Sequence, residues 1–231
     1  MIYSFGKNVV IGLGGSIVYP DGIDVDFLTK FRVFLKQEIK KGRKFVIVIG
    51  GGRVARVYQE AASKIVKVTD EDKDWLGIHA TRCNAHLLRT IFRDIADPVV
   101  FDARHKRKKL KYPVTIASGW RPGWSTDYVA AQIAIDLKIP EVIIWGKPEY
   151  VFDRDPMKFS EAKPYSEISW KAYRKIIPAK WSPGAHAPVD PIAAKTAASK
   201  RLRCIVVGRD FENCRNLLAG REFEGTVITN G

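Results

Sequence analysis

Glycine-containing segments follow three runs of apolar, β-forming residues in this chain. They are NVVIGLGGS (8–16), KFVIVIGGGRVAR (44–56) and PVTIASGWRPGWSTD (113–127). Glycine leaves its backbone N–H groups uncovered, so a charged oxygen can approach the main chain closely. If the strands are parallel neighbours, the turns line the carboxyl edge of one sheet, where open α/β sheets bind ligands. The sequence therefore predicts a shared anion site in which two phosphorylated ligands meet end to end.

The second segment is the strongest candidate for a phosphate site. Three glycines at 50–52 end the apolar run, and Arg56 follows one helical turn later. A helix start of this kind attracts an anion through the helix dipole, through exposed backbone N–H groups and through the bidentate guanidinium of an arginine. In the first segment, Gly14 and Gly15 could hold a transferring phosphoryl group or form only a tight turn. Neither GxxxxGK[ST] nor GxGxxG is present, which argues against a P-loop and a dinucleotide site.

The third segment places hydroxyl and carboxyl groups at the start of a helix. Ser125 and Thr126 could cap the helix, as such residues commonly do. Asp127 could orient groups around a transferred phosphate or bind it through a metal ion. Trp120 and Trp124 could stack on a base or only bury apolar area, and the residue types leave both readings open.

Composition excludes several classes of protein. The 231 residues are 46% apolar and 28% charged, which suits one sizeable soluble enzyme domain. We expect no membrane span, because no apolar run approaches about 20 residues, and no signal peptide, because the start lacks an h-region. Three cysteines in no metal-like spacing favour a reducing cytoplasm.

The net charge of +14 favours polyanionic ligands such as nucleotides or nucleic acid. The densest basic block is HKRKKLK (105–111), and Lys195, Lys200, Arg201 and Arg203 form a second one. No aromatic residue interleaves the first block and no nucleic-acid-binding motif surrounds it. We therefore interpret both blocks as solvated faces and do not expect nucleic acid as a partner.

Apolar periodicity alternates between strands and helices. It predicts strands at 9–13, 45–49, 98–101, 114–117, 141–145, 204–207 and 226–228, and helices at 24–41, 53–65, 76–94, 126–137, 191–199 and 212–219. This alternation predicts an α/β fold, a three-layer αβα sandwich around a mostly parallel sheet. Residues 146–191 hold most of the twelve prolines and should form loops, short helices and a hairpin. We expect one domain over 1–231, with an acceptor-side lobe to about residue 135 and a donor-side lobe after it.

The motifs resemble those of the amino-acid-kinase superfamily, and within it the archaeal-type uridylate (UMP) kinases. The matching stretches are IGLGGSIVYP, VIVIGGGRVARVY, KDWLGIHATRCNAHLL, SGWRPGWSTDYVAAQIA, FDRDPMKFSEAKPYSEIS, VDPIAAKTAASK and GTVI, in the family's order from residue 11 to 228. The resemblance implies transfer of the γ-phosphoryl group of ATP to the phosphate of UMP, giving ADP and UDP. Such transfer needs alignment and charge neutralisation. The resemblance also implies Mg²⁺ and a homo-oligomer, usually a hexamer.

The resemblance implies roles for individual residues. Gly14 and Gly15 would hold the transferring group, and Asp127 would organise the centre. Gly51 would face UMP and Asp74 would contact the acceptor nucleoside. The loop closing around UMP would comprise Trp120, Arg121, Pro122, Gly123, Trp124, Ser125 and Thr126. Phosphates near the donor, or ATP itself, would be bound by Gly52, Arg56, Gly146, Lys147, Phe152 and Asp155.

Three departures from the family pattern support a second hypothesis. Gly12 stands where many relatives carry lysine and archaeal-type members often aspartate. GKPEYVF (146–152) replaces TNVDGVY, and the acceptor loop carries tryptophans and an arginine where Thr, His and His are usual. The alternative is a protein that binds nucleotide or an oxyanion without transferring phosphate, or one that phosphorylates a different small acceptor.

Overall fold

A seven-stranded sheet forms the centre of the computed structural model, which describes residues 5–104, 109–180 and 187–231. Its strand order is β3-β2-β1-β4-β8-β9-β7. Neighbouring strands from β3 to β8 are parallel, whereas β9 is antiparallel to β8. The strands are β1 (Asn8–Leu13), β2 (Lys44–Ile49), β3 (Val114–Ala117), β4 (Glu141–Trp145), β7 (Glu167–Ser169), β8 (Arg203–Val207) and β9 (Thr226–Thr229). A separate hairpin pairs β5 (Val151–Phe152) with β6 (Pro164–Tyr165).

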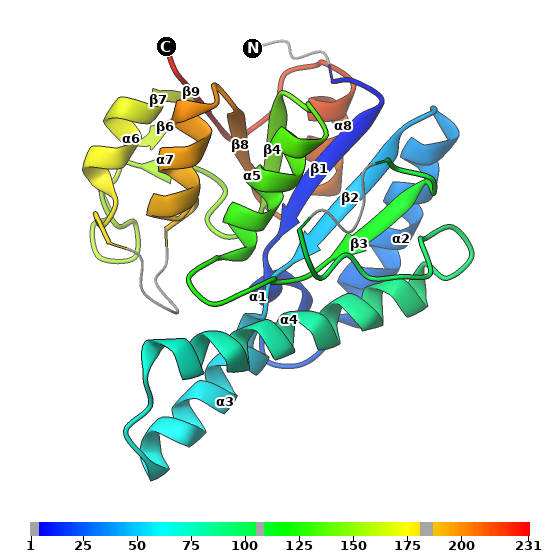
Figure 1. Cartoon of the computed structure of the whole chain (residues 1–231). Helices are drawn as coiled ribbons and strands as arrows, with labels where there is room; N and C mark the ends of the chain where they lie inside the picture. The colour runs from blue at the N-terminus through cyan, green and yellow to red at the C-terminus, as the bar shows by residue number, and fades with distance from the viewer. Residues whose placement is uncertain (1–4, 105–108, 181–186) are drawn as a thin grey trace.

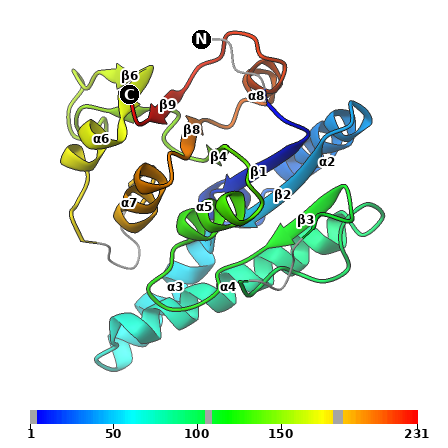
Figure 2. The same cartoon turned by 45° about the horizontal axis from the view of Figure 1, so that its top comes forward.

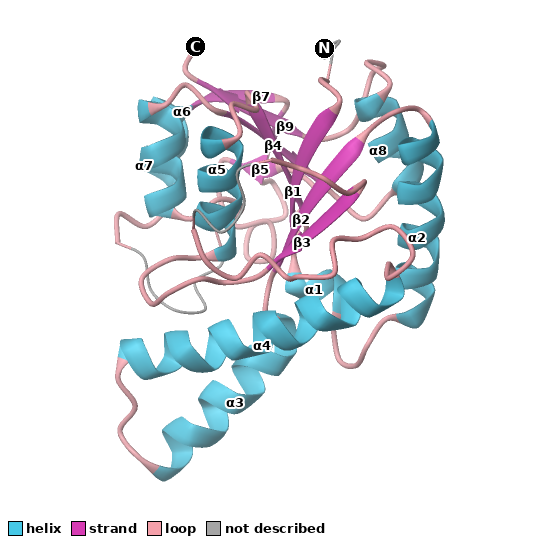
Figure 3. Ribbon diagram, turned by 45° about the vertical axis from the view of Figure 1, so that its right-hand side comes forward, coloured by secondary structure: helices cyan, strands magenta, loops and turns pink. Residues whose placement is uncertain are grey.

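Helices cover both faces of this sheet, as Figures 1 and 3 show. They are α1 (Gly15–Val18), α2 (Val25–Lys40), α3 (Gly52–Ile65), α4 (Asp70–Ile91), α5 (Thr126–Asp136), α6 (Trp170–Ile176), α7 (Pro191–Ser199) and α8 (Phe211–Leu218). Successive strand residues alternate between faces, so Val9 packs with α2, α4 and α8, and Val10 packs with α5, α6 and α7. The predicted αβα sandwich with a mostly parallel sheet is confirmed.

Two element predictions need correction. The strand expected at 98–101 is absent from the described residues, where only isolated bridges join Ala96 to Val114 and Phe101 to Ala117. Helix α4 begins at Asp70, six residues before the expected position, because Thr69 and Asp72 form a capping box. The hairpin and short helix expected after residue 146 are present as β5–β6 and α6.

The helices α3 and α4 form an arm that projects beyond the sheet (Figures 1 and 2). Helix α3 buries none of its residues, whereas Ile78, Ala85 and Leu88 of α4 are buried. The arm starts from the carboxyl edge of the sheet, which is the edge where the glycine turns lie.

The sheet runs without a break through the strand β1, which pairs with β2 on one side and β4 on the other. The division into two lobes near residue 135 stays a prediction. In the basic block at 105–111, residues 105–108 lie outside the described residues. None of the described helices is both long and apolar enough to cross a membrane.

Candidate active site

Glycine follows each of the five parallel strands from β3 to β8 within two residues of the strand end. These glycines are Gly119, Gly50, Gly14, Gly146 and Gly208, in the order of the strands across the sheet. Main-chain hydrogen bonds join the turns: Gly50 N donates to Leu13 O (3.0 Å), Gly14 N to Trp145 O (2.8 Å) and Gly146 N to Val207 O (3.0 Å). The turns therefore form one continuous row along the carboxyl edge of the sheet.

The turns after β1 and β2 pack too closely for any side chain. A Cβ atom on Gly15 would lie 2.2 Å from Gly52 N, and one on Gly52 would lie 2.4 Å from Gly15 O. Gly52 also has φ +63°, a conformation that favours glycine. The buried Asn84 of α4 donates to the carbonyl oxygens of Gly50 (2.9 Å) and Gly51 (3.2 Å). Backbone packing alone therefore requires glycine at positions 15 and 52.

Gly15→Ala is expected to destabilise the fold, because the clashing atoms belong to the main chain and cannot swing away. Overpacking of this kind costs about 1–3 kcal/mol, which lowers Tm by about 2–12 °C in a chain of this size. Gly22→Ala is the control, since a Cβ there meets nothing within 4 Å. Thermal unfolding measures both variants, and equal Tm values for the two would contradict the close approach.

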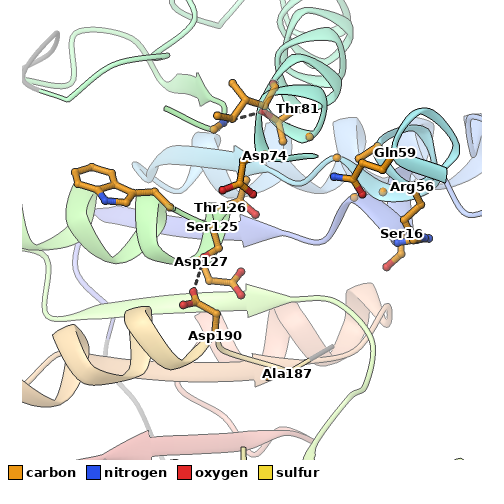
Figure 4. Close-up of a pocket in the computed structure, with 18 residues that line it drawn as sticks. Ser16, Arg56, Gln59, Asp74, Thr81, Ser125, Thr126, Asp127, Ala187 and Asp190 are labelled. Atoms are coloured by element: carbon orange, nitrogen blue, oxygen red, sulfur yellow. Dashed lines mark hydrogen bonds between the residues drawn. The ribbon is translucent and has the colours of Figure 1, made fainter. Parts of the chain in front are cut away.

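The described residues enclose a pocket of about 280 Å³ over the turns of β1, β2 and β3, shown in Figure 4. Its wall is made by Gly15, Ser16, Gly51, Gly52, Ala55, Arg56, Gln59, Asp74, Gly77, Ile78, Thr81, Gly119, Trp124, Ser125, Thr126, Asp127, Ala187 and Asp190. Ser16, Arg56 and Gln59 lie on one side of the view, beside the column formed by Ser125, Asp127 and Asp190. The volume is close to that of small-molecule sites.

Nine of the predicted site residues line this pocket and nine do not. The first group is Gly15, Gly51, Gly52, Arg56, Asp74, Trp124, Ser125, Thr126 and Asp127. The second group is Gly14, Trp120, Arg121, Pro122, Gly123, Gly146, Lys147, Phe152 and Asp155. The roles assigned to all of them stay predictions.

The two tryptophans of the acceptor loop have different surroundings. Trp120 is 6% exposed and belongs to the core, where its Nε1 donates to Phe101 O (3.1 Å). Trp124 lines the pocket, and its ring is 4.7 Å from the Arg121 guanidinium carbon and 4.7 Å from the Tyr128 ring centre. Of the two readings left open by the sequence, burial of apolar area is what Trp120 does.

A hydrogen bond ties the acceptor loop to α4. Gly123 N donates to Asp74 Oδ2 (2.7 Å), and Gly123 has φ +79°. Burial raises the pKa of Asp74, while this hydrogen bond acts in the opposite direction and the nearby charges of Asp70 and Glu71 add to the rise. Asp74 therefore holds the acceptor loop against α4 through its Oδ2 atom.

On the donor side, Gly146 directly follows β4, and Phe152 belongs to the β5–β6 hairpin. Asp155 Oδ1 accepts from Met157 N (3.0 Å), and Asp153 Oδ1 accepts from Lys163 N (2.8 Å). Asp155 therefore stabilises the turn that follows it, and Asp153 bridges the two sides of the β5–β6 hairpin.

Two carboxyl groups meet at the base of the pocket. Asp190 caps α7, because its Oδ1 accepts from Ile192 N (2.8 Å) and Ala193 N (3.0 Å), while Ser125 Oγ donates to its Oδ2. Burial raises the pKa of Asp127 to about 8, helped by the charge of Asp190 and opposed by the Asp190 backbone N–H. Burial also raises the pKa of Asp190.

No lysine or arginine among the described residues forms an ion pair with this acidic pair. A Cβ atom built on Gly12 would lie 3.9 Å from Asp127 Oδ1 and 3.0 Å from Ile144 Cδ1. A side chain at position 12 would therefore be confined between Ile144, Ala130 and Asp127, and glycine leaves the carboxyl without a charged neighbour from this position.

Comparison with known proteins adds an independent observation to this geometry. Residues 7–208 match the model of the amino acid kinase family. The chain belongs to the amino acid kinase family. It is 34% identical over 206 residues to the uridylate kinase of Thermococcus sibiricus, covering 88% of this chain and 91% of that protein. It is 33% identical over 227 residues to the uridylate kinase of Thermoplasma acidophilum, covering 96% of each.

Solved structures of this family share the fold. The uridylate kinase of Archaeoglobus fulgidus superposes with a TM-score of 0.81 at 27% identity, covering 97% of this chain and all of that one. The UMP kinase of Bacillus anthracis has a TM-score of 0.76 at 20% identity, which shows likeness of fold alone. The resemblance to archaeal-type members of the amino acid kinase family is confirmed.

Sequence reasoning missed several residues that line the pocket of this amino acid kinase. The helix α3 contributes Gly52, Ala55, Arg56 and Gln59, and α4 contributes Asp74, Gly77, Ile78 and Thr81. Both sets have the spacing i, i+3, i+4, i+7, which is one face of a helix. Extending that spacing from Arg56 and from Asp74 would have found Gln59 and Thr81. Asp190 had a local signal too, because an aspartate before proline is typical of a helix start.

Proposed function

We propose that this protein is an ATP-dependent UMP kinase, which moves the γ-phosphoryl group of ATP to the phosphate of UMP and yields UDP and ADP. The observation that carries the proposal is the pocket at the carboxyl edge of the sheet, where Arg56 and the start of α3 lie beside the acidic pair of Asp127 and Asp190. The relatives that it matches over most of their length include the uridylate kinases of two Thermococcus species. The biological role would be pyrimidine nucleotide synthesis in the cytoplasm.

The resemblance placed Arg56 with the donor phosphates, and we assign it instead to the acceptor phosphate at the start of α3, because Arg56 lines the same pocket as Asp74 and Trp124. Arg56 lines the pocket, and within the described residues it has no carboxylate partner. The first N–H groups of α3 and its dipole favour an anion at the same place. Asp74 Oδ1 and Thr126 would then contact the nucleoside, and Gly14 and Gly15 would cradle the transferring group.

Mg²⁺ is the cofactor that we propose, and the residues present suit it. Asp127 and Asp190 offer hard oxygen ligands, and a cation would offset the burial, and the smaller effect of the Asp190 charge, that together raise the pKa of Asp127. No group of three acidic, histidine or cysteine side chains suited to a metal occurs among the described residues. The ion would therefore be shared between one or two carboxylates and substrate phosphates, which is common for Mg²⁺. When bound, it neutralises charge on the phosphoryl group.

A homo-oligomer, with the hexamer of the family as the expected form, is part of the proposal. The α3–α4 arm supports it, because apolar side chains on the arm and its connecting turn are exposed to solvent. They are Val57 (48% exposed), Tyr58 (61%), Ile65 (82%), Val66 (61%) and Trp75 (40%). A second copy would cover this surface.

The activity is tested with purified protein, ATP, Mg²⁺ and a panel of acceptors, followed by separation of the nucleotide products. We expect UDP from UMP, and much lower turnover with CMP, carbamate and isopentenyl phosphate. Gly12 favours the alternative of a binder without transfer, because glycine offers no charged group near Asp127 at the position where the resemblance leads us to expect lysine or aspartate. A thermal shift with UMP, ATP or molybdate in the absence of any product from folded protein would establish that alternative.

A further inference from the structure

Glu149 lies beside Gly208, at one end of the row of glycine turns, and this end does not line the acceptor pocket. The pocket covers the turns after β3, β2 and β1, whereas Gly146 and Gly208 continue the row after β4 and β8. A Cβ atom built on Gly208 would lie 2.2 Å from Glu149 Cγ and 2.8 Å from its Oε1. The glutamate side chain therefore rests directly on the main chain of Gly208.

The order of the glycine turns along the sheet edge determines the direction in which the donor nucleotide must extend from the acceptor. In the proposed reaction, the γ-phosphoryl group meets the acceptor phosphate near Gly14 and Gly15, so the rest of the donor extends along the row toward β8. Strands are spaced about 4.8 Å apart, which places the end of β8 about 10 Å from the end of β1. That distance is comparable with the length of a triphosphate chain, so the sugar of the donor reaches Glu149. The surface at Gly146 is open, since a Cβ there meets nothing within 4 Å.

The chemistry at this end suits a sugar and not a phosphate. Arg209, which follows Gly208, is paired with Asp24 and lies over the Phe27 ring at 5.3 Å. Asp210 accepts from the N–H groups of Glu212 (2.6 Å) and Asn213 (3.0 Å) and so closes the start of α8. Both charged side chains that directly follow Gly208 are thus already engaged within the protein.

Glu149 has no hydrogen-bond or ion-pair partner among the described residues, and its side chain is exposed. A carboxylate accepts hydrogen bonds only, and sugar hydroxyls are donors that match it. Acidic side chains serve the ribose hydroxyls of bound nucleotides in this way on other α/β sheets. We propose that Glu149 binds the ribose hydroxyls of the donor nucleotide and sets the preference for a ribonucleotide donor. This inference rests on the proposed kinase function.

The test is the direct binding of ATP, 2′-deoxy-ATP and 3′-deoxy-ATP, measured by calorimetry with Mg²⁺ and without acceptor. The wild type is expected to bind ATP about 10-fold more tightly than at least one deoxy analogue. The analogue lacks a hydroxyl that would donate to the Glu149 carboxylate, and the loss of a hydrogen bond to a charged group lowers affinity by about this factor or more. Glu149→Gln should reduce that ratio, and Glu149→Ala should bring it close to one. The affinity for the deoxy analogue should change little.

Two further variants separate this role from a structural one. Gly208→Ala should also lower the ratio, because its Cβ would displace the Glu149 side chain without altering its charge. Glu222→Gln, at another exposed glutamate, should leave the ratio unchanged. If the wild type binds ATP but the ratio is the same in Glu149→Ala, the ribose assignment is wrong and the kinase proposal stands. If the wild type binds no ATP, both fail.

Discussion

Asp127→Asn is expected to lower kcat for UMP phosphorylation by about 10²–10³-fold, the usual effect of removing one preorganised electrostatic group from a transfer site. Asp127 lines the pocket between the α3 phosphate site and the glycine row, so its carboxylate can act on the transferring group or its metal ion. Asparagine keeps the shape but cannot become the carboxylate that the proposed Mg²⁺ would stabilise despite the raised pKa of Asp127. The measurement is steady-state kinetics with saturating UMP and ATP.

The matched control for this change is Asp136→Asn at the other end of α5, where the carboxylate pairs with Arg104 at 3.0 Å outside the pocket. Its kcat should stay close to that of the wild type. If Asp127→Asn retained kcat within about threefold, Asp127 would not organise the transfer, and the central charge would have to come from elsewhere.

The same variant has a consequence for stability that does not depend on activity. Burial and Asp190 raise the pKa of Asp127 to about 8, above the 3.8 of an unperturbed carboxyl. Between these values the folded state keeps a proton that the unfolded chain has released, so the stability of the wild type falls as pH rises through this window. The Tm of Asp127→Asn relative to the wild type should therefore increase from pH 5 to pH 8 in EDTA. A constant difference would contradict the raised pKa.

The fold could be predicted because its signals are local. Apolar runs ended by glycine mark β1, β2 and β4, and the phenylalanines of α2 recur at the spacing of a buried helix face. The strand predicted at 98–101 was wrong because an apolar run forms a strand only when a neighbouring strand pairs with it continuously. Here β3 makes only isolated bridges, at Ala96 and Phe101. The strand β7 was missed because it has only three residues, of which Ile168 alone is buried, so no apolar run marks it in the sequence.

The site was predictable in part for a related reason. Arg56 and Asp127 stand next to glycine turns or helix starts, where chemistry can be inferred from neighbours in the sequence. Asp190 reaches the pocket only because α7 packs on α5 and places its cap beside Ser125. The positions of Trp120 and Trp124 likewise depend on tertiary packing. Trp120 is buried in the core, where it donates to Phe101 O, whereas Trp124 packs on Tyr128 of α5 at the pocket wall.

Arg56→Ala is expected to weaken UMP binding by about 10- to 100-fold, because hydrogen bonds between charged groups contribute about 1.5–3 kcal/mol. Arg56→Lys should recover only part of the loss, since the ammonium lacks the two-pronged geometry that matches a phosphate. Calorimetry with UMP and with uridine locates the effect. The uridine affinity should be unchanged if Arg56 contacts only the phosphate.

The control for Arg56 lies on the same helix. Arg53→Ala removes an arginine that is paired with Asp21 at 2.9 Å and does not line the pocket. It changes the net charge equally, so any loss caused only by weaker long-range attraction would appear in both variants and diminish with salt. A local contact predicts that the difference between the two variants persists in high salt. Equal losses of UMP affinity in both variants would show that Arg56 does not contact the phosphate, and that the overall positive charge of the chain accounts for its effect on binding.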